Sequence, residues 1–413
     1  MGGAPEARVR RRLVSASNRN DGPSAHLPVP SGHSQQPSVP HLIHILPSFG
    51  IGGQQIRLAH VVNRLAERFR HTVVSLDGTT TARTLVGETE NLTVEVWNAP
   101  KHWLPRPRLL RQSCAFLKGL NPTVLLTYNW GATEWALANR MWLRLPHLHF
   151  EDGFGADESP TRQLRRRVLF RRLALGGSKT QIIVPSQQLY RLAIDVWRFN
   201  RSKVLHVPNG IDCDRFLAHP DSELAARVGR KPDEVIVGTV AALRPEKNLP
   251  RLIRAFAALP SSTVTRLVIA GDGPVRPQLQ ALVREARLED RVVFAGPVTG
   301  ANQILGLFDL FALSSDTEQM PYSVLEAMAV GLLIVAIDVG DIRIMVAEEN
   351  RNLIVSCTDE TGFVKALGSL LHNGDLRSRL GRLNAERARQ EYDVTAMVAR
   401  YDKLIGSSAD MRT

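Results

Sequence analysis

Two glutamates eight positions apart, Glu318 and Glu326, have the spacing that is most informative about chemistry in this chain. The apolar run 310–313 precedes them and is typical of a buried strand. Pro321 then suits the first position of a helix, where its missing N–H leaves no hydrogen bond unmade. We therefore expect Glu318 in a loop after a strand and Glu326 within the first two turns of a helix.

The start of that helix also predicts an anion site. The free backbone amides of Tyr322 and Ser323 would point out of the helix N-terminus and favour a phosphate. A phosphate does not favour carboxylates beside it, so hydroxyl groups are the natural partners of the two glutamates. Sugars and riboses carry such hydroxyls, and the pattern therefore suggests a site for a nucleotide sugar.

Length and composition set limits on the class of protein. A chain of 413 residues with 44% apolar residues predicts two or three domains with full cores. The net charge of +12 predicts an anionic partner, such as nucleic acid, acidic lipid head groups or nucleotide phosphates. The three cysteines are odd in number and far apart, which fits neither a disulfide framework nor a metal site and indicates a reducing, cytosolic compartment. No apolar stretch is long enough for a membrane span, and the N-terminus lacks the apolar segment of a signal peptide.

Strands and helices are expected to alternate after a polar, basic tail, 1–39, which we predict to be disordered. The expected strands are 41–46, 72–76, 124–126, 148–150 and 182–184 in a first series, then 235–240, 267–270, 292–294, 310–313, 334–337 and 353–355 in a second. Such alternation predicts an α/β protein with two doubly wound, Rossmann-like domains of parallel strands, which we place at 40–208 and 209–390. Because ligands bind at the carboxyl ends of such strands, the site is expected in a cleft between the two domains.

Four short motifs follow apolar segments of the chain. The glycine-rich segment 50–55 suits either close approach of a ligand or a tight strand-to-helix turn. Arg244 and Lys247 suit a diphosphate, although a solvated basic loop would have the same composition. For the segments 208–212 and 271–274, a tight turn alone would explain the residues present.

Six arginines crowd into eleven positions without an acid among them. They are Arg162, Arg165, Arg166, Arg167, Arg171 and Arg172. This stretch predicts contact with an anionic membrane surface or a lipid-phosphate acceptor, and the alternative is a solvated basic helix. No aromatic platform or recognised module accompanies it, so nucleic acid is not the expected partner.

The order of these motifs along the chain resembles that of the family 4 retaining glycosyltransferases, which have the two-domain GT-B architecture. The resemblance rests on 50–55, 207–212, 243–248, 270–274 and 318–329, and it covers about residues 41–406. It implies an acceptor-binding N-terminal domain, a C-terminal domain for the nucleotide sugar, and a final segment, 391–413, whose helix returns to the N-terminal domain.

The resemblance also implies roles for individual residues. Glu318 would contact the transferred sugar and stabilise charge at its anomeric carbon, and Glu326 would hold the ribose hydroxyls. Lys247 would pair with the diphosphate, which Gly52 and Gly53 would approach from the other domain. The implied donor-binding set is Gly52, Gly53, Arg244, Lys247, Gly271, Asp272, Met320, Pro321, Tyr322 and Glu326. No metal or other cofactor is implied, because cations and helix dipoles supply the countercharge.

Several positions depart from the family pattern. Ala242 replaces a common arginine, and Arg244, two positions on, could supply the missing cation. Gln319 stands where glycine is common, as does Asp341. Leu333 and Ile344 stand where proline and an acid are common.

The catalytic group of the N-terminal domain is expected after the strand 148–150. A His-Asp pair is frequent in the family at this point, and here Glu151 and Asp152 occupy the two positions. They are the preferred candidates, and a register slip of two would place His149 there instead.

These features together predict transfer of a sugar from a nucleoside-diphosphate sugar to a hydroxyl, with retention at the anomeric carbon. A lipid-linked or saccharide acceptor in cell-surface polysaccharide or glycolipid assembly would place the protein in the cytoplasm, peripherally on the inner membrane face. The alternatives are a sugar-nucleotide epimerase or hydrolase of related fold, and a basic binding protein on a degenerate transferase fold.

Overall fold

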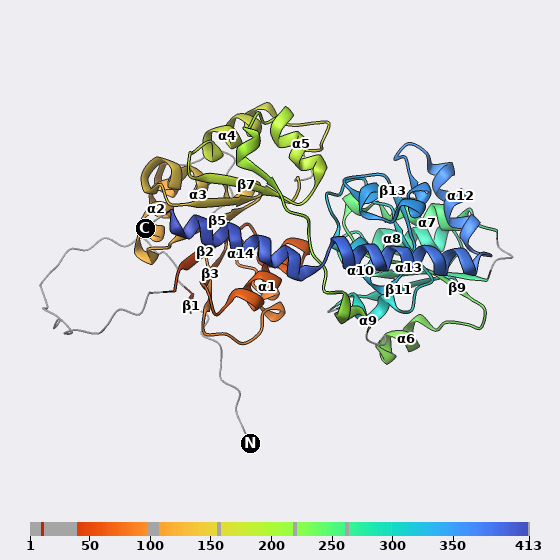
Figure 1. Cartoon of the computed structure of the whole chain (residues 1–413). Helices are drawn as coiled ribbons and strands as arrows, with labels where there is room; N and C mark the ends of the chain where they lie inside the picture. Colours follow the sequence, from red (N-terminus) through yellow and green to blue (C-terminus); the bar gives the residue numbers. More distant parts are fainter. Residues whose placement is uncertain are drawn as a thin grey trace, which may run out of the picture. The chain divides into compact units, whose positions relative to one another are not determined.

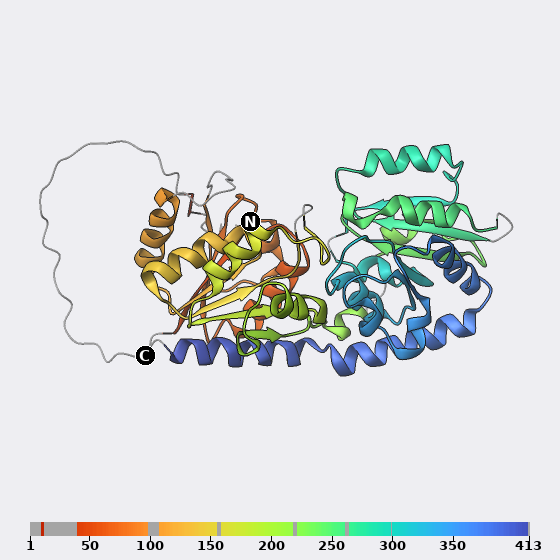
Figure 2. The same cartoon turned by 90° about the horizontal axis from the view of Figure 1, so that it is seen from above.

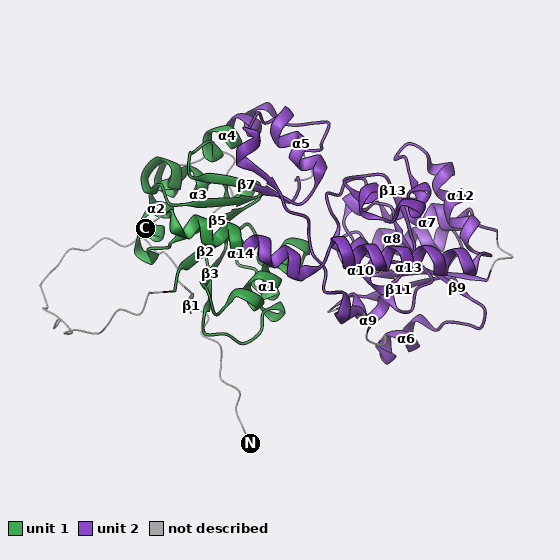
Figure 3. Ribbon diagram, in the orientation of Figure 1, with its two compact units in different colours: residues 1–150, 170–182, 402–413 green, residues 151–169, 183–401 purple. Residues whose placement is uncertain are grey.

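The computed structural model describes residues 10–11, 39–97, 107–154, 158–217, 221–260, 264–298 and 300–411. The predicted disordered tail lies outside the described residues, apart from residues 39 and 10–11, and the latter form a two-residue strand, β1 (Arg10–Arg11). The chain divides into two compact units (Figure 3), with residues 1–150, 170–182 and 402–413 in unit 1 and residues 151–169 and 183–401 in unit 2. Residues 151–169 and 183–208 thus group with unit 2, and the predicted domain limits stay predictions.

The first sheet has the strand order β1-β4-β3-β2-β5-β6-β7-β8 among the described residues. Its strands after β1 are β2 (His41–Leu46), β3 (Arg70–Ser75), β4 (Leu92–Val96), β5 (Val124–Tyr128), β6 (His147–Phe150), β7 (Thr180–Val184) and β8 (Val204–His206). The pairings of β2 with β3 and with β5 are parallel, as the series of alternating strands and helices predicted.

Unit 2 contains the second sheet, with the order β11-β10-β9-β12-β13-β14 in the part of the chain that the structure describes. Its strands are β9 (Val235–Val240), β10 (Thr265–Ala270), β11 (Val292–Gly296), β12 (Leu310–Leu313), β13 (Ile334–Ile337) and β14 (Ile354–Val355). All neighbouring pairs in this sheet are parallel.

Helices alternate with the strands in both series (Figure 1). Those before the second sheet are α1 (Gly53–Leu65), α2 (Pro107–Leu120), α3 (Thr133–Ala138), α4 (Arg165–Leu175), α5 (Gln187–Asp195) and α6 (Ser222–Val228). The later ones are α7 (Leu249–Ala257), α8 (Arg276–Glu285), α9 (Asn302–Leu305), α10 (Tyr322–Val330), α11 (Ile342–Met345), α12 (Glu360–Leu370), α13 (Gly374–Glu391) and α14 (Val394–Asp410). No helix within the described ranges has the length and apolarity that a bilayer crossing requires.

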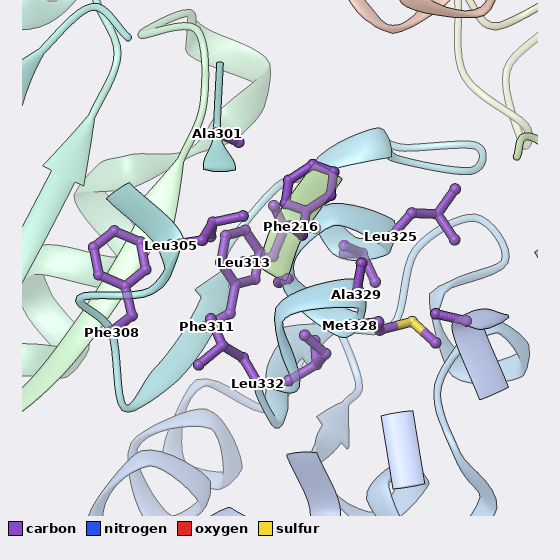
Figure 4. Packing of buried hydrophobic residues seen from close by; sticks show 14 of the residues in the cluster. Phe216, Ala301, Leu305, Phe308, Phe311, Leu313, Leu325, Met328, Ala329 and Leu332 are labelled. Atoms are coloured by element: carbon purple, nitrogen blue, oxygen red, sulfur yellow. The ribbon is translucent and has the colours of Figure 1, made fainter. Parts of the chain in front are cut away.

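Successive side chains of the second sheet enter two different cores. Phe311 and Leu313 of β12 pack with α9 and α10 in one cluster (Figure 4), whereas Leu310 and Ala312 pack with α7, α8 and α12 in the other. Helices therefore cover both faces of this sheet, as Figure 2 also shows. This arrangement confirms the predicted doubly wound α/β class, because a parallel sheet that is buried on both faces carries apolar residues on both.

The C-terminal helices have separate packing partners. Helix α13 lies against α10, and a β carbon added to Gly381 of α13 would be 1.9 Å from the carbonyl oxygen of Gly331. Residues 402–413 belong to unit 1, where Asp402 of α14 forms an ion pair with Arg68. The last helix thus ends in the unit that holds most of the first sheet, as the resemblance implied.

Candidate active site

The two strands that precede the predicted site residues are neighbours in the second sheet. From β9 the chain continues to β10 and β11 on one side, and it returns to β12 on the other side of β9. The loops that follow β9 and β12 therefore diverge at a topological switch point, where open α/β sheets bind ligands. The first loop carries Lys247 and the second carries Glu318.

Hydrogen bonds join these two loops along their length. The backbone N–H of Asp316 donates to the carbonyl of Glu246 at 2.9 Å, and the Ser314 hydroxyl donates to the carbonyl of Lys247 at 3.1 Å. Arg251, at the start of α7, donates to the Asp316 carboxylate at 2.8 Å. The position of one loop therefore fixes the position of the other.

Lys247 and Glu318 meet at the centre of this arrangement. The lysine Nζ lies 2.6 Å from Oε1 of Glu318, and the Ser315 hydroxyl donates to the same oxygen at 2.7 Å. The side chains of Lys247 and Glu318 keep 24% and 10% of their surface exposed, so the ion pair remains accessible. A bound diphosphate would compete with Glu318 for the ammonium group, because both are anions.

Glu326 lies on α10, which begins at Tyr322. We predicted Pro321 at the first helical position, but it lies one position earlier, as the extended residue immediately before the helix. No side chain caps the start of the helix. The Glu326 side chain is partly buried; its burial raises its pKa to about 7, and the positive charge of Arg215 opposes this shift. Near neutral pH the ionised carboxylate can accept hydrogen bonds from hydroxyls, and the protonated carboxyl group can donate one to a hydroxyl.

The motif around Asn209 contributes a contact that spacing alone did not predict. The Asn209 side-chain amide donates to the carbonyl of Met320 at 2.9 Å, and its backbone N–H contacts the Met320 sulfur at 3.1 Å. Asn209 thus supports the backbone two positions after Glu318. Sequence reasoning explained this residue as part of a turn, since nothing local indicates a partner 111 positions away.

The glycines of the segment 271–274 serve close packing. Gly271 has φ +134°, and a β carbon on it would lie 1.9 Å from the carbonyl oxygen of Ala241. The carbonyl of Asp272 accepts the N–H of Leu243 at 2.9 Å, while its carboxylate pairs with Arg276. These contacts hold the start of the loop that carries Lys247; a donor contact by Gly271 or Asp272 stays a prediction.

The remaining donor candidates are placed as follows. Arg244 is exposed and caps the short helix Pro245–Lys247 through its backbone, so its side chain is available to an anion. Met320 and Tyr322 are buried. Gly52 and Gly53 belong to unit 1, where Gly52 is the extended N-cap of α1.

The N-terminal catalytic candidates differ in their surroundings. His149 is fully buried in β6, with its Nδ1 2.8 Å from the Thr127 hydroxyl. Glu151 is also fully buried, and Asp152 is partly buried. A β carbon on the next residue, Gly153, would lie 3.8 Å from Cγ of Gln319, so this segment reaches the loop of Glu318 within unit 2.

The arginine-rich stretch is less uniform than its sequence suggests. Arg171 is completely buried, with its guanidinium 5.1 Å from the centre of the Trp130 ring, so its predicted place on a membrane-facing surface is wrong. Arg167 forms an ion pair with the buried Glu158 at 3.1 Å. The other four, Arg162, Arg165, Arg166 and Arg172, are exposed. The error arose because an arginine can be buried over an aromatic ring without an acid close to it in sequence.

Exposed apolar side chains accompany these arginines. Leu169 and Leu173 lie one turn apart on α4 and are 68% and 51% exposed. Arg140 donates to the carbonyl of Leu173, which brings the exposed Met141 and Trp142 to the end of the same helix. Sequence reasoning missed these four apolar residues; their separate positions in the chain give no joint signal.

Metal-ligating side chains do not gather in groups of three or more anywhere in the described ranges. Charged groups at the switch point include Lys247, Glu318, the exposed Arg244 and the Asp316–Arg251 pair. Cationic side chains are therefore available there to an anionic ligand.

Two parallel-sheet units with a lysine–glutamate pair at a switch point agree with the architecture that the resemblance to GT-B glycosyltransferases implied. The model of the "Glycosyltransferase Family 4" matches residues 51–215, and that of the "Glycosyl transferases group 1" matches residues 221–387. These matches lie side by side and take in most of the chain. The chain belongs to the family 4 type of glycosyltransferases.

Individual relatives agree with this assignment. The chain is 26% identical to the D-inositol 3-phosphate glycosyltransferase of Stackebrandtia nassauensis, over 98% of this chain and 96% of the relative. It is also 26% identical to the N-acetyl-alpha-D-glucosaminyl L-malate synthase of Bacillus anthracis, but this match spans about half of each protein, 48% of this chain and 52% of the relative.

Among solved structures, Anabaena HepE in complex with UDP resembles this chain with a TM-score of 0.72 and 18% identity, covering 89% of this chain and 99% of HepE. At this identity the likeness concerns the fold alone, and it confirms the predicted GT-B class.

Proposed function

We propose that this glycosyltransferase transfers a sugar from a nucleoside-diphosphate sugar to a hydroxyl acceptor with retention of the anomeric configuration. The observation that carries the proposal is the Lys247–Glu318 pair, 2.6 Å apart and partly exposed at the topological switch point of unit 2. A cation there suits the diphosphate, and a carboxylate beside it suits the sugar.

The donor assignment draws on the same site. The HepE structure was solved with UDP, and uridine diphosphate is therefore the first nucleotide to test here. Lys247 would exchange Glu318 for the diphosphate, and the freed carboxylate of Glu318 would then face the sugar. Glu326, on α10, would bind the ribose hydroxyls.

The chemical step follows from where charge develops. Cleavage of the anomeric C–O bond leaves negative charge on the diphosphate and positive charge on the sugar. Lys247 and the amides at the start of α10 stabilise the first, Glu318 stabilises the second, and both interactions strengthen in the transition state. The acceptor hydroxyl attacks from the face that the diphosphate leaves, and its proton passes to the departing phosphate oxygen. Glu151 and Asp152 are the candidate acceptor-side groups.

The decisive experiment combines binding with turnover. UDP, GDP and ADP are compared by thermal shift, since a ligand that binds the folded state raises its melting temperature. Transfer from the corresponding glucose nucleotide is then measured, and the anomeric configuration of the product is read by NMR. Lys247→Ala is expected to lower kcat/KM by about 100-fold, while Lys365→Ala, which removes an exposed lysine of α12, leaves it unchanged.

Four results would argue against this proposal. A product with inverted anomeric configuration would contradict the proposed retention. Equal activity of Lys247→Ala and wild type would exclude Lys247 from the active site. Complete turnover of the sugar nucleotide without an acceptor indicates the epimerase or hydrolase alternative instead. We expect EDTA to have no effect on transfer; loss of activity with EDTA would require a metal.

For the acceptor we infer a hydroxyl compound with an anionic group, presented at a membrane surface in cell-surface glycolipid or polysaccharide assembly. The names of the two relatives specify inositol 3-phosphate and malate, which are both anionic hydroxyl compounds. The exposed arginines of α4 and the apolar Trp142 and Leu173 at its end combine positive charge with groups that insert into lipid interfaces.

Vesicle flotation tests this part separately. Wild type should float with vesicles that contain phosphatidylglycerol and remain unbound with pure phosphatidylcholine. Leu173→Ser should reduce flotation, and Val264→Ser, at an equally exposed position of unit 2, should leave it unchanged. Equal flotation of the two variants would exclude α4 as the membrane contact.

A further inference from the structure

Two residues that depart from the family pattern, Gln319 and Asp341, lie in contact in the structure. The backbone N–H of Asp341 donates to the carbonyl of Gln319 at 2.8 Å. Gly340 has φ +61°, and a β carbon on it would lie 2.6 Å from the carbonyl oxygen of Glu318. The segment 340–341 therefore presses directly on the backbone of the loop that carries Glu318.

The Asp341 side chain connects this loop to helix α5. Its carboxylate accepts the backbone N–H of Gln187 at 2.6 Å and that of Gln188 at 3.2 Å. These are the first two residues of α5, whose initial amides have no partner inside the helix. A carboxylate at this position stabilises the helix through both hydrogen bonds and the helix dipole.

Gln319 makes a second connection to the same point. Ser186 is the N-cap of α5 and accepts the N–H of Leu189 at 3.0 Å, while its hydroxyl donates to Oε1 of Gln319 at 2.9 Å. Ser186, Gln319 and Asp341 are all buried, so water does not replace these bonds at low free-energy cost.

We propose that Ser186, Gln319 and Asp341 form a latch that fixes the loop of Glu318 to helix α5 and so positions Glu318 for catalysis. The inference rests on the proposed function of Glu318. Gln319 and Asp341 stand where glycine is common, and glycine would have no side chain there. In this chain both side chains form hydrogen bonds with the start of α5.

The latch matters most when a donor binds. Glu318 is held by Lys247 and Ser315, and the proposed reaction turns Lys247 toward the diphosphate. The position of the loop then depends more heavily on contacts to the residues that follow Glu318. A displacement of about 1 Å at a reacting group can lower a rate by about 100-fold, so loss of the latch is expected in kcat.

The test compares Gln319→Ala, Ser186→Ala and the double variant with wild type. UDP release from UDP-glucose in the presence of acceptor gives kcat, and calorimetry gives the Kd of UDP. We expect kcat to fall about 10- to 100-fold in each single variant, with the Kd of UDP changed by less than about threefold. The double variant should be no slower than the slower single one, because both substitutions break one hydrogen bond.

Matched variants separate positioning from stability. Ser186→Thr keeps a hydroxyl and an N-cap, and it should retain most of the activity. Asp359→Ala removes the N-cap of α12, a carboxylate that accepts the N–H of Gly362 at 2.8 Å, and should lower stability without lowering kcat. Equal loss of kcat in Asp359→Ala, or additive losses in the double variant, would overturn the latch.

Hydrogen–deuterium exchange provides a readout that needs no turnover. Asp341→Asn should speed exchange in the first turn of α5, and Ser186→Ala should speed it in residues 318–320, while Asp359→Ala changes neither. Unchanged exchange in both segments would contradict the latch. If wild type shows no transfer from any nucleotide sugar but these exchange effects appear, the proposed function fails and the mechanical connection stands.

Discussion

The two sheets of this protein share one design but differ in the chemistry of their cores. The second sheet is filled almost entirely by valine, isoleucine, leucine, alanine and phenylalanine, as is usual for a parallel sheet that is covered on both faces. The first sheet buries five histidines, His41, His44, His71, His147 and His149, which we call the histidine network. Parallel sheets of this kind are therefore compatible with an apolar core and with a core that contains buried histidines.

The histidine network is satisfied largely by its own hydrogen bonds. His44 contacts the Tyr128 hydroxyl at 2.9 Å and His71 at 3.0 Å. On the other face of the sheet, His41 contacts the Thr72 hydroxyl at 2.8 Å. Burial lowers the pKa of His44 well below its usual value, and burial also lowers those of His41 and His71 to about 4.

Further along the sheet, Thr127 lies between two histidine rings. Its hydroxyl is 2.8 Å from Nε2 of His147 and 2.8 Å from Nδ1 of His149. Burial lowers the pKa of His147 well below its usual value, so its ring is neutral in the folded protein. In unit 2, by contrast, the carboxyl group with a pKa near 7 belongs to the candidate active site. Protons are thus expected to control folding in unit 1 and ligand binding in unit 2.

The largest expected effect is selective acid unfolding of unit 1. Between about pH 4 and 6.5, His41 and His71 are protonated in the unfolded chain but neutral in the fold, so the unfolded state binds more protons and stability falls as the pH falls. His71 alone accounts for roughly 3 kcal/mol over this window. We expect the fluorescence of tryptophans in unit 1, among them Trp97, Trp130 and Trp135, to report unfolding at pH 5 while the second sheet keeps its protection from hydrogen exchange.

The comparison would fail if both sheets lost protection together on acidification. It would also fail if the unfolding free energy of unit 1 did not change between pH 7 and 5. A steeper proton dependence in unit 2 than in unit 1 would reverse the assignment.

A substitution in the second sheet should have a somewhat smaller effect that does not depend on pH. A β carbon on Gly238 of β9 would lie 2.0 Å from the buried ring of Phe308. Gly238→Ala should lower the unfolding free energy of unit 2 by about 3 kcal/mol, equally at pH 7 and 5, because the cause is overpacking. Chemical denaturation followed by hydrogen exchange in β9 and β12 measures it.

Gly368→Ala is the matched control in the same unit. A β carbon there would meet only Leu259, at an ordinary 3.5 Å, and the residue lies in helix α12, so stability should not fall and should rise by up to about 1 kcal/mol. Equal losses of unfolding free energy in the two variants would mean that a clash with the Phe308 ring is not the cause.

How much of this the sequence predicts differs between the two units. Apolar runs such as 310–313 predicted the strands of the second sheet and five strands of the first, because hydrophobic periodicity is local. The strands β1, β4 and β8 were not predicted. Family motifs singled out Lys247 and Glu318, but they did not predict the direct ion pair between the two side chains. The contacts of Asn209, Gln319 and Asp341 were not predicted either, because their partners are more than a hundred positions away in the chain. Similarly, the burial of Arg171 depends on an aromatic ring 41 positions away, which no local pattern indicates.

A smaller effect concerns ligand binding in unit 2. Because burial raises the pKa of Glu326 to about 7, its carboxyl group is mostly protonated at pH 6 and mostly ionised at pH 8. An ionised carboxylate accepts hydrogen bonds from both ribose hydroxyls, so the Kd of UDP should fall by about three- to tenfold between pH 6 and 8. Calorimetry at the two pH values measures this change.

Glu326→Gln removes the titrating group and keeps its shape. Its affinity for UDP should be weaker than that of wild type at pH 8 and should show no such pH dependence. A variant that keeps the full pH dependence would exclude Glu326 as the titrating group.

The smallest expected effect tests whether the two units unfold separately. Gly406 lies in α14, in the part of that helix that belongs to unit 1, and a β carbon there would meet no other atom within 4 Å. Gly406→Ala should therefore stabilise unit 1 by about 0.5–1 kcal/mol, because alanine has less backbone freedom to lose in a helix. The acid transition of unit 1 should move to lower pH, while the denaturant midpoint of unit 2 stays fixed.

Gly381→Ala, in α13, should instead destabilise unit 2, since its β carbon would lie 1.9 Å from the carbonyl oxygen of Gly331. If either substitution shifted both transitions equally, the units would unfold as one, and the proton sensitivity of the first sheet would destabilise the active site as well.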